Sequence, residues 1–186
     1  MRVLQSYVAG QWHTPSGGGV EVHDATTGET VARVGSDGID VASALRFARE
    51  TGGPALRRMT FGQRAGILKA LGAHLGEHKE ELYALSTPAG ATRPDAWLDI
   101  EGGTGVLAVY ASKGRRELPD TTFLRDGDPE VLARDGSFLG LHLLVPREGV
   151  AVLVNAFNFP VWGMLKKVVP ALLPGVPVLV KPAPPS

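Results

Sequence analysis

The sequence predicts an α/β fold, and three observations carry that prediction. Residues 149–182 show the pattern strand, loop, helix, strand, because two runs of Val, Leu and Ala flank an apolar stretch with helical spacing. Residues 36–112 repeat apolar side chains at the spacing typical of amphipathic helices. Residues 1–35 alternate polar and apolar side chains between turns, as antiparallel strands do.

The N-terminal meander, residues 1–35, is expected to contain three strands. The first covers 6–12 and the second 20–23, with the turn Pro15-Ser16-Gly17-Gly18-Gly19 between them. A third strand is predicted at 29–34, after a Thr-Gly turn. We expect this segment to lie at an edge of the fold.

The helical part, residues 36–112, begins with two helices whose starts are marked by capping residues. Asp40 is a good N-cap for a helix over roughly 40–50. Thr60 and Gln63 match a capping box, in which the two side chains bond reciprocally to backbone amides at the helix start. These local signals predict where both helices begin.

Two further helical stretches are expected in the same part of the chain. One covers 77–85, and the other follows Pro94, which suits the first turn of a helix, and runs to Tyr110. The glycines within 102–105 should weaken the middle of this helix. No strand precedes them, so close helix packing or a kink is favoured over a phosphate-binding loop.

Residues 113–148 are expected to leave the core. Charged and turn-forming side chains dominate 113–137, which indicates an excursion over the surface. Residues 138–145 are apolar and strand-like. We therefore predict a charged excursion followed by one strand.

The C-terminal segment, 149–186, is predicted to be a βαβ unit. Its strands are 150–154 and 176–180, and both are apolar throughout, which is typical of strands covered on both faces. The helix between them contains Pro170, which removes a backbone hydrogen bond and predicts a kink or an early stop. A crossover of this kind is right-handed, and it makes the two strands parallel. Ligands of such sheets gather at the carboxyl ends of the strands, and Asn158 and Lys181 lie there.

Composition narrows the classes of function. The chain has 186 residues, is 44% hydrophobic and carries 19 basic and 19 acidic side chains. Charges that cancel, with no basic cluster, argue against nucleic acid as a partner. The absence of a long apolar run or a signal-peptide pattern predicts a cytoplasmic protein with no membrane partner. The sequence has no cysteine, so disulfides, thiolate metal sites and thiol nucleophiles are excluded within these residues.

Several motifs resemble one known family. The turn FNFP followed by a helix, the helix end PALLPG and the strand end LVKPA are similar to the first half of the cofactor domain of aldehyde dehydrogenases. Further stretches, among them SYVAGQW, DIEGGTGVLAVYAS and NAFNFPVWGM, resemble the branch that forms the aldehyde dehydrogenase half of bifunctional enzymes in aerobic phenylacetate degradation. The resemblance covers essentially the whole chain.

The resemblance implies a fold, a reaction and roles for particular residues. It implies the N-terminal part of a Rossmann-type parallel sheet with a helical layer, and an antiparallel arm used for homo-oligomerisation. The implied activity is NADP- or NAD-dependent oxidation of an aldehyde, a semialdehyde linked to coenzyme A, to the acid. Asn158 would donate its side-chain amide to the oxyanion that forms when a cysteine thiolate attacks the aldehyde. Lys181 would bind the adenosine ribose, and Val154, Asn155 and Phe157 would line the nicotinamide side.

The sequence also departs from the family pattern. Pro184 stands where many NAD-preferring relatives have a glutamate that binds the ribose 2′-hydroxyl, which favours NADP and leaves NAD open. The family's nucleophilic cysteine, its carboxylate base and its glycine loop are absent from these residues, so we expect the chain alone not to oxidise aldehydes. The alternative is a non-catalytic fragment that binds nucleotide weakly or pairs with a homologous subunit.

Each candidate residue has a plainer interpretation. An asparagine before Phe-Pro is commonly only a turn and capping residue, and Lys181 on its own would be a solvated lysine. His74 and His78 have the spacing of a shared metal ligand pair, but they lack the order of a zinc-protease motif, so no metal site is predicted. Trp162 is expected in the core or at an interface, with a weaker hypothesis that it lies near the substrate entrance.

Overall fold

The structure, a computed structural model, describes residues 2–183. Five short strands come first: β1 (Arg2–Val3), β2 (Ser6–Val8), β3 (Gln11–His13), β4 (Val20–His23) and β5 (Thr30–Val34). The helices that follow are α1 (Val41–Phe47), the π-helical turn Ala48–Gly52, α2 (Gly53–Arg58), α3 (Phe61–Glu77), α4 (Lys79–Ser86) and α5 (Arg93–Arg116). The chain then forms β6 (Leu124–Val131), β7 (Leu139–Leu144), β8 (Ala151–Val154), α6 (Pro160–Leu172) and β9 (Val178–Lys181).

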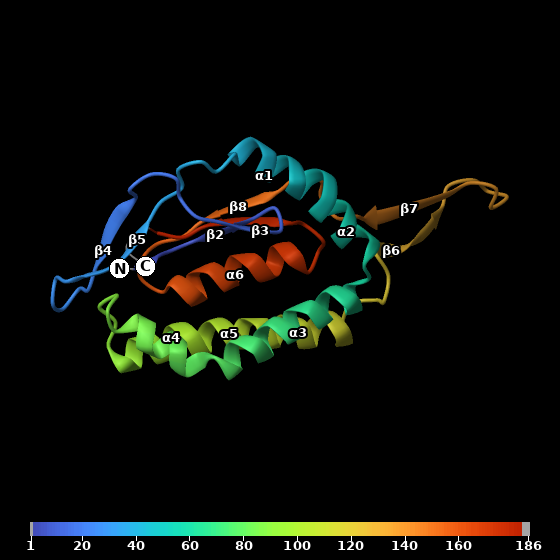
Figure 1. The fold of residues 1–186 in the computed structure, drawn as a ribbon. Helices are drawn as coiled ribbons and strands as arrows, with labels where there is room; N and C mark the ends of the chain where they lie inside the picture. The colour runs from blue at the N-terminus through green and yellow to red at the C-terminus, as the bar shows by residue number, and fades with distance from the viewer. Residues whose placement is uncertain (1, 184–186) are drawn as a thin grey trace.

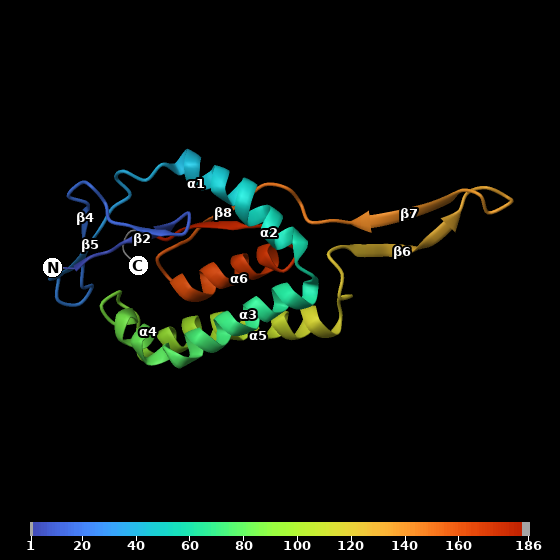
Figure 2. The same ribbon diagram turned by 45° about the vertical axis from the view of Figure 1, so that its right-hand side comes forward.

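Helix α6 lies in the middle of the molecule, between the strand pair β8–β9 and a layer formed by α3, α4 and α5 (Figure 1). Helices α1 and α2 lie on the other side of the strand pair in the same view. The hairpin β6–β7 projects away from this body, as both views show (Figure 2). None of the described helices is long and apolar enough to cross a membrane.

The main core is the seam where α3, α5 and α6 meet. Its buried side chains come from all three helices and from the residue after α6; they are Ala65, Leu68, Leu107, Ala111, Leu165, Val169 and Leu173. Small residues allow the backbones to come close. A Cβ atom on Gly114 of α5 would lie only 2.9 Å from a methyl group of Leu173 and 3.1 Å from the Cβ of Ala65. Gly102, Gly103 and Gly114 of α5 therefore serve close helix packing, as the sequence predicts for part of 102–105, whereas Gly105 faces open space.

The predicted βαβ unit is confirmed. Strands β8 and β9 are parallel, with Ala151 opposite Val178 and Val154 opposite Lys181. Helix α6 continues past Pro170 to Leu172, so the proline does not stop it early, and Gly175 then turns the chain with a φ of 99°. One detail is wrong: the side chains of β8 alternate between half-buried and exposed, so only one face of this strand is covered in the described chain.

The predicted capping of the helices is also confirmed. Asp40 accepts from the backbone amide of Ser43, and Thr60 and Gln63 form the reciprocal capping box with distances of 3.2 and 2.9 Å. The first helix does not stop near residue 50, however. A π-helical turn carries it into α2, where Pro54 lies in the first turn and has no amide hydrogen to lose.

The N-terminal meander is paired differently from the prediction. Residues 6–12 are not one strand, because Ala9 and Gly10 both have positive φ and form a two-residue hairpin turn between β2 and β3. Strand β4 pairs with β5 rather than with the first strand, and β1 adds to β5 in parallel. The sequence prediction missed this turn because it lacks the usual Asn-Gly or Asp-Gly signal.

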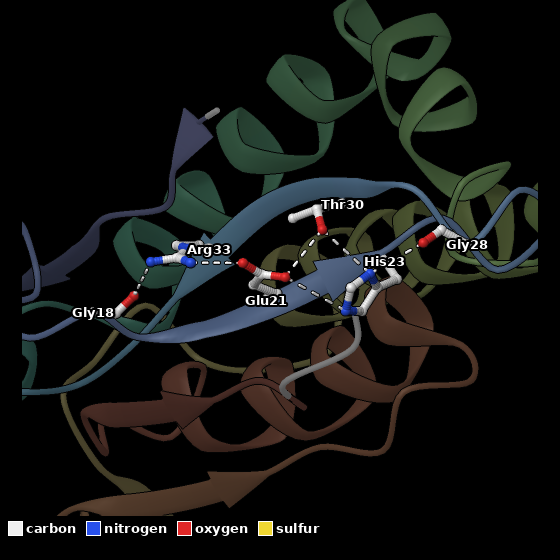
Figure 3. Close-up of polar contacts among 6 residues, drawn as sticks. All are labelled: Gly18, Glu21, His23, Gly28, Thr30 and Arg33. Carbon is white, nitrogen blue, oxygen red and sulfur yellow. Dashed lines mark hydrogen bonds and ion pairs between the residues drawn. The ribbon is translucent and has the colours of Figure 1, made fainter.

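A polar network lies on the β4–β5 pair (Figure 3). Glu21 accepts from the guanidinium of Arg33 at 2.6 Å and from the hydroxyl of Thr30 at 3.1 Å. His23 lies 4.0 Å from the same carboxylate, and its other ring nitrogen is 3.2 Å from the carbonyl oxygen of Gly28. The hydrogen bonds from Arg33 and Thr30 lower the pKa of Glu21, so the network favours its charged form.

About half of the excursion predicted at 113–137 is regular structure. Its first residues form the last turn of α5, and 124–131 form β6, which the sequence analysis did not predict. The strand predicted at 138–145 is β7, which pairs with β6 in an antiparallel hairpin interrupted by an irregularity between Asp126 and Glu130. The side chains of this hairpin are almost all exposed.

Candidate functional site

The turn between β8 and α6 holds an unusual backbone conformation. Phe159, the residue before the helix, has φ 56° and ψ 54°, which lies in the left-handed region and is uncommon for a residue with a side chain. Its own side chain provides no cap for the helix. Pro160 follows and supplies no amide hydrogen. The first free amides of α6, on Val161 and Trp162, therefore need an acceptor from elsewhere.

A carboxylate from another helix supplies that acceptor. The two oxygens of Asp99, on α5, accept hydrogen bonds from the backbone amides of Val161 at 3.0 Å and Trp162 at 2.7 Å. Asp99 is only 4% exposed. A negative charge at this position also faces the positive end of the helix dipole. Sequence reasoning missed Asp99, although its place among buried Ala96, Ile100 and Gly103 on one helix face was a usable signal.

The other end of α6 is held by a buried cation. Arg64, on α3, is 1% exposed and donates from Nε to the carbonyl oxygen of Leu173 at 2.7 Å. A second guanidinium nitrogen donates to the carbonyl oxygens of Leu56 and Met59. Burial lowers the pKa of Arg64 from its ordinary value. Helix α6 thus has a carboxylate at its N-terminus and a guanidinium at its C-terminus.

Three of the predicted site residues meet at the carboxyl ends of β8 and β9. Val154 lies opposite Lys181, and the backbone amide of Asn155 donates to the carbonyl oxygen of Lys181 at 3.1 Å. Val154 is 67% exposed, so its side chain is open to a ligand. The ammonium of Lys181 is exposed and donates to the carbonyl oxygen of Pro182, while Lys167 donates to the carbonyl oxygen of Val154.

Asn155 carries an unsatisfied polar atom. The residue is 8% exposed, and its side-chain oxygen has no hydrogen-bond partner within the described chain. A buried acceptor without a partner is costly, so such atoms in native proteins call for an explanation. Its position at the carboxyl ends of a parallel strand pair, where these sheets bind nucleotides, fits a ligand that donates to it. The residues present therefore fit a dinucleotide cofactor.

Asn158 and Phe157 line a cavity of about 300 Å³ between the turn and the N-terminal part of α5. The remaining lining comes from the end of α4, the loop after it and the start of α5: Ser86, Ala89, Gly90, Ala91, Asp95, Ala96, Asp99, Phe159 and Pro160. Asn158 is exposed, and its amide makes no hydrogen bond within the described residues. A neutral amide donor is thus available to a ligand.

Other residues considered in the sequence have ordinary surroundings. The rings of His74 and His78 lie with their centroids 4.6 Å apart and are tilted by 55°, and Nδ1 of His78 lies 2.8 Å from a carboxylate oxygen of Glu81. The described chain holds no group of three potential metal ligands. The ring of Trp162 lies against Gly102 and nearly perpendicular to the ring of Phe159, at 87°. Trp162 therefore belongs to the packing between α5 and α6. Pro184 lies outside the described residues.

Comparisons with known proteins agree with this geometry. The profile of the aldehyde dehydrogenase family matches residues 12–186. The 3,4-dehydroadipyl-CoA semialdehyde dehydrogenase of Aromatoleum evansii is 45% identical over 184 residues, which cover 98% of this chain and 36% of that protein. The NADP(+) succinate-semialdehyde dehydrogenase of Escherichia coli strain K12 is 25% identical over 181 residues, or 96% of this chain and 36% of that protein.

Solved structures share the fold. A 3,6-anhydro-L-galactose dehydrogenase in complex with NAP superposes with a TM-score of 0.81 at 24% identity, over 98% of this chain and 36% of that one. An NADP-dependent enzyme of Escherichia coli gives a TM-score of 0.79 at 24% identity, over 99% and 36%. The chain thus spans a little over a third of the length of these relatives. With the family profile matching nearly all of its residues, the chain belongs to the aldehyde dehydrogenase family.

Proposed function

We propose that these residues form the first βαβ unit of an NADP- or NAD-dependent aldehyde dehydrogenase that oxidises a semialdehyde linked to coenzyme A to the acid. The observation that carries the proposal is the free side-chain amide of Asn158, which lines a cavity on the turn just before the helix that Asp99 caps. The relative from Aromatoleum evansii, a dehydrogenase of a CoA semialdehyde, supports the substrate class. The proposed role in aerobic phenylacetate degradation rests on the resemblance of motifs such as NAFNFPVWGM.

In the proposed reaction the chain supplies an oxyanion donor. A cysteine thiolate outside these residues attacks the aldehyde carbon, and the carbonyl oxygen becomes an alkoxide. The side-chain amide of Asn158 donates to that oxygen, and since the amide is neutral it stabilises the developing charge without becoming an ion itself. Removing one such donor typically costs about 3 to 4 kcal/mol in the transition state. Once the substrate carbon has given up a hydride, an acyl thioester remains, and water hydrolyses it to the acid and the free thiol.

The cofactor would lie across the carboxyl ends of β8 and β9. When bound, the nicotinamide accepts the hydride released by the substrate carbon. Lys181 would hydrogen-bond the adenosine ribose, while Val154, Asn155 and Phe157 would line the nicotinamide side. The exposed ammonium of Lys181 and the unsatisfied oxygen of Asn155 support these roles. NADP is favoured over NAD because Pro184 replaces an acidic residue common in NAD-preferring relatives.

Two substitutions in a full-length enzyme that contains these residues test the proposal. Asn158→Ala should lower kcat by about 100- to 1000-fold and leave the Kd for NADP within about twofold, because its amide serves only the reacting oxygen. Lys181→Ala should do the reverse and weaken NADP binding with a smaller change in kcat. An unchanged kcat in Asn158→Ala would remove this residue from the oxyanion site.

We also propose that the enzyme is a homo-oligomer that uses the β6–β7 hairpin. The hairpin projects from the body and exposes a row of apolar side chains, including Leu139, Leu141 and Leu143, each about half exposed or more. Exposed apolar strands of this size commonly mark interfaces. Leu141→Asp should shift the assembly to a smaller mass in multi-angle light scattering, with unchanged circular dichroism. A mass equal to that of the unmodified enzyme would argue against the hairpin as the interface.

The second candidate function is a non-catalytic one for the 186 residues by themselves. The absence of any cysteine favours it, because the thioester route needs a sulfur. In this case the chain would bind nucleotide weakly or pair with a homologous subunit. Titration of the isolated chain with NADPH, followed by nicotinamide fluorescence, tests the first option.

A further inference from the structure

The hydrogen bonds of Asp99 join the layer of helices to the turn that presents Asn158. Asp99 belongs to α5 and is buried, whereas Asn158 lies two residues before the helix that Asp99 caps. Both carboxylate oxygens are used, one for each of two consecutive amides. An acceptor from a distant element therefore replaces the local side chain that usually caps a helix.

The local backbone cannot hold this turn on its own. The left-handed conformation of Phe159 has an energetic cost, and residues in such conformations persist only where the surroundings hold them. The structure contains such a constraint. A Cβ atom on Gly103 would lie 3.1 Å from the backbone nitrogen of Trp162, so α5 and α6 are in close contact here, within reach of a side chain as short as aspartate.

We propose that Asp99 is a positioning residue for Asn158: by capping α6 it fixes the left-handed turn, and hence the direction of the Asn158 amide. This inference rests on the proposed function of Asn158 as oxyanion donor. Asp99 itself does not touch the reacting atoms. Its effect on catalysis passes through the geometry of the turn, and displacements of about 1 Å in such a donor can lower turnover by about 100-fold.

A structural measurement tests the positioning without activity. In the full-length enzyme, hydrogen exchange followed by mass spectrometry should show faster exchange in peptides spanning 159–163 for Asp99→Asn, by about tenfold, since one amide loses its acceptor. Glu101→Gln is the matched control. It removes the same charge from the same helix, but Glu101 contacts Tyr83 and Lys79 rather than α6, so exchange of 159–163 should stay unchanged.

A double-mutant cycle tests whether Asp99 acts through Asn158. Asp99→Asn should lower kcat by about 10- to 100-fold with little change in the Kd for NADP. In an Asn158→Ala background the same substitution should have no further effect on kcat, because there is no donor left to position. Equal effects of Asp99→Asn in both backgrounds would overturn the proposal, and so would unchanged exchange together with unchanged kcat.

The two proposals fail in different ways. If Asn158→Ala alone leaves kcat unchanged, the oxyanion role is lost, and the exchange data still report whether Asp99 holds the turn. Should Asp99→Asn not fold, as judged by circular dichroism, Asp99→Glu provides the same test, since it keeps the charge and displaces the carboxylate by one methylene. Wild-type kcat and exchange in a folded Asp99→Glu variant would overturn the positioning role.

Discussion

The guanidinium of Arg64 donates a hydrogen bond of 2.7 Å to the carbonyl oxygen of Leu173, at the end of α6 opposite the one that Asp99 caps. The two charges have the signs that the helix dipole favours: a cation at the C-terminus and an anion at the N-terminus. They come from α3 and α5, the two helices that pack against α6 in the core. Helix α6, and with it the crossover between β8 and β9, is therefore fixed by charged groups at both ends.

Replacing Arg64 should destabilise the fold strongly. Arg64→Met removes the guanidinium donor of the carbonyl oxygens of Leu56, Met59 and Leu173, of which, in the described chain, only that of Leu56 keeps a bond, from the amide of Met59. We expect a loss of about 2 to 4 kcal/mol in the free energy of unfolding. Urea unfolding followed by circular dichroism measures the change. Arg58→Met is the control, since Arg58 is exposed and its side chain makes no hydrogen bond within the described residues. Similar losses for both variants would contradict a stabilising role for the bonds that Arg64 donates.

The relation between Arg64 and Leu173 also shows what the sequence could not predict. The capping box of Thr60 and Gln63 was predictable because its partners are three residues apart and the bonds depend only on local geometry. The parallel strand pair was predictable for a similar reason, since a βαβ connection fixes its own direction. Arg64 and Asp99 act across the tertiary fold. The residues next to a charged side chain in the sequence do not indicate which helix end that side chain will contact.

The candidate site also has parts that local signals predict and parts that depend on tertiary contacts. The positions of Asn158 and Lys181 at strand ends followed from the order of the elements, and the structure places them as expected. Neither the cavity that Asn158 and Phe157 line nor the left-handed conformation of Phe159 followed in this way, because the other lining residues come from α4, the loop after it and α5. Such a conformation is imposed by contacts with α5 and has no signature in the local sequence.

The network on β4 and β5 predicts a pH dependence of stability. The pKa of Glu21 is lowered in the folded state by hydrogen bonds from Arg33 and Thr30, so the folded state favours the charged carboxylate. Its stabilising effect is fully present above the ordinary pKa of 4.5 and is lost as the pH falls through the folded-state pKa. Melting temperatures of Glu21→Gln and the unmodified chain should therefore differ near pH 7, and the difference should shrink as the pH falls below the lowered pKa of Glu21. A difference that is constant with pH would rule out this contribution.

The 186-residue chain by itself should not oxidise aldehydes. It contains no cysteine, so no thioester can form on it, and Asn158 would have no alkoxide to stabilise. Incubation with NADP and a semialdehyde should give no NADPH absorbance above a control without protein. Formation of NADPH in proportion to the amount of purified chain would contradict this expectation and would require a nucleophile other than sulfur.

The isolated chain should also associate in solution. The face of β8 that carries Val152 and Val154 is exposed, and so are the apolar side chains of the β6–β7 hairpin. Strands with uncovered apolar faces tend to pair with other chains. Size-exclusion chromatography with light scattering should show species larger than one chain, and a single monomeric peak would contradict the prediction.

The glycines of α5 provide a test of the contact between α5 and α6, with two substitutions of opposite sign. A Cβ atom on Gly103 would lie 3.1 Å from both the backbone nitrogen of Trp162 and a methyl group of Val161, so Gly103→Ala must push the helices apart. We expect it to lower the free energy of unfolding by about 1 to 3 kcal/mol.

Gly105, two residues later, has no atom within 4 Å of such a Cβ. There the substitution only adds helix propensity, so Gly105→Ala should stabilise the chain by about 0.5 to 1 kcal/mol. The two variants make the same chemical change in the same helix. The difference between their free energies of unfolding in urea therefore isolates the packing of α5 against the N-terminus of α6. Equal effects would mean that the close approach at Trp162, on which the reach of Asp99 depends, is not present in solution.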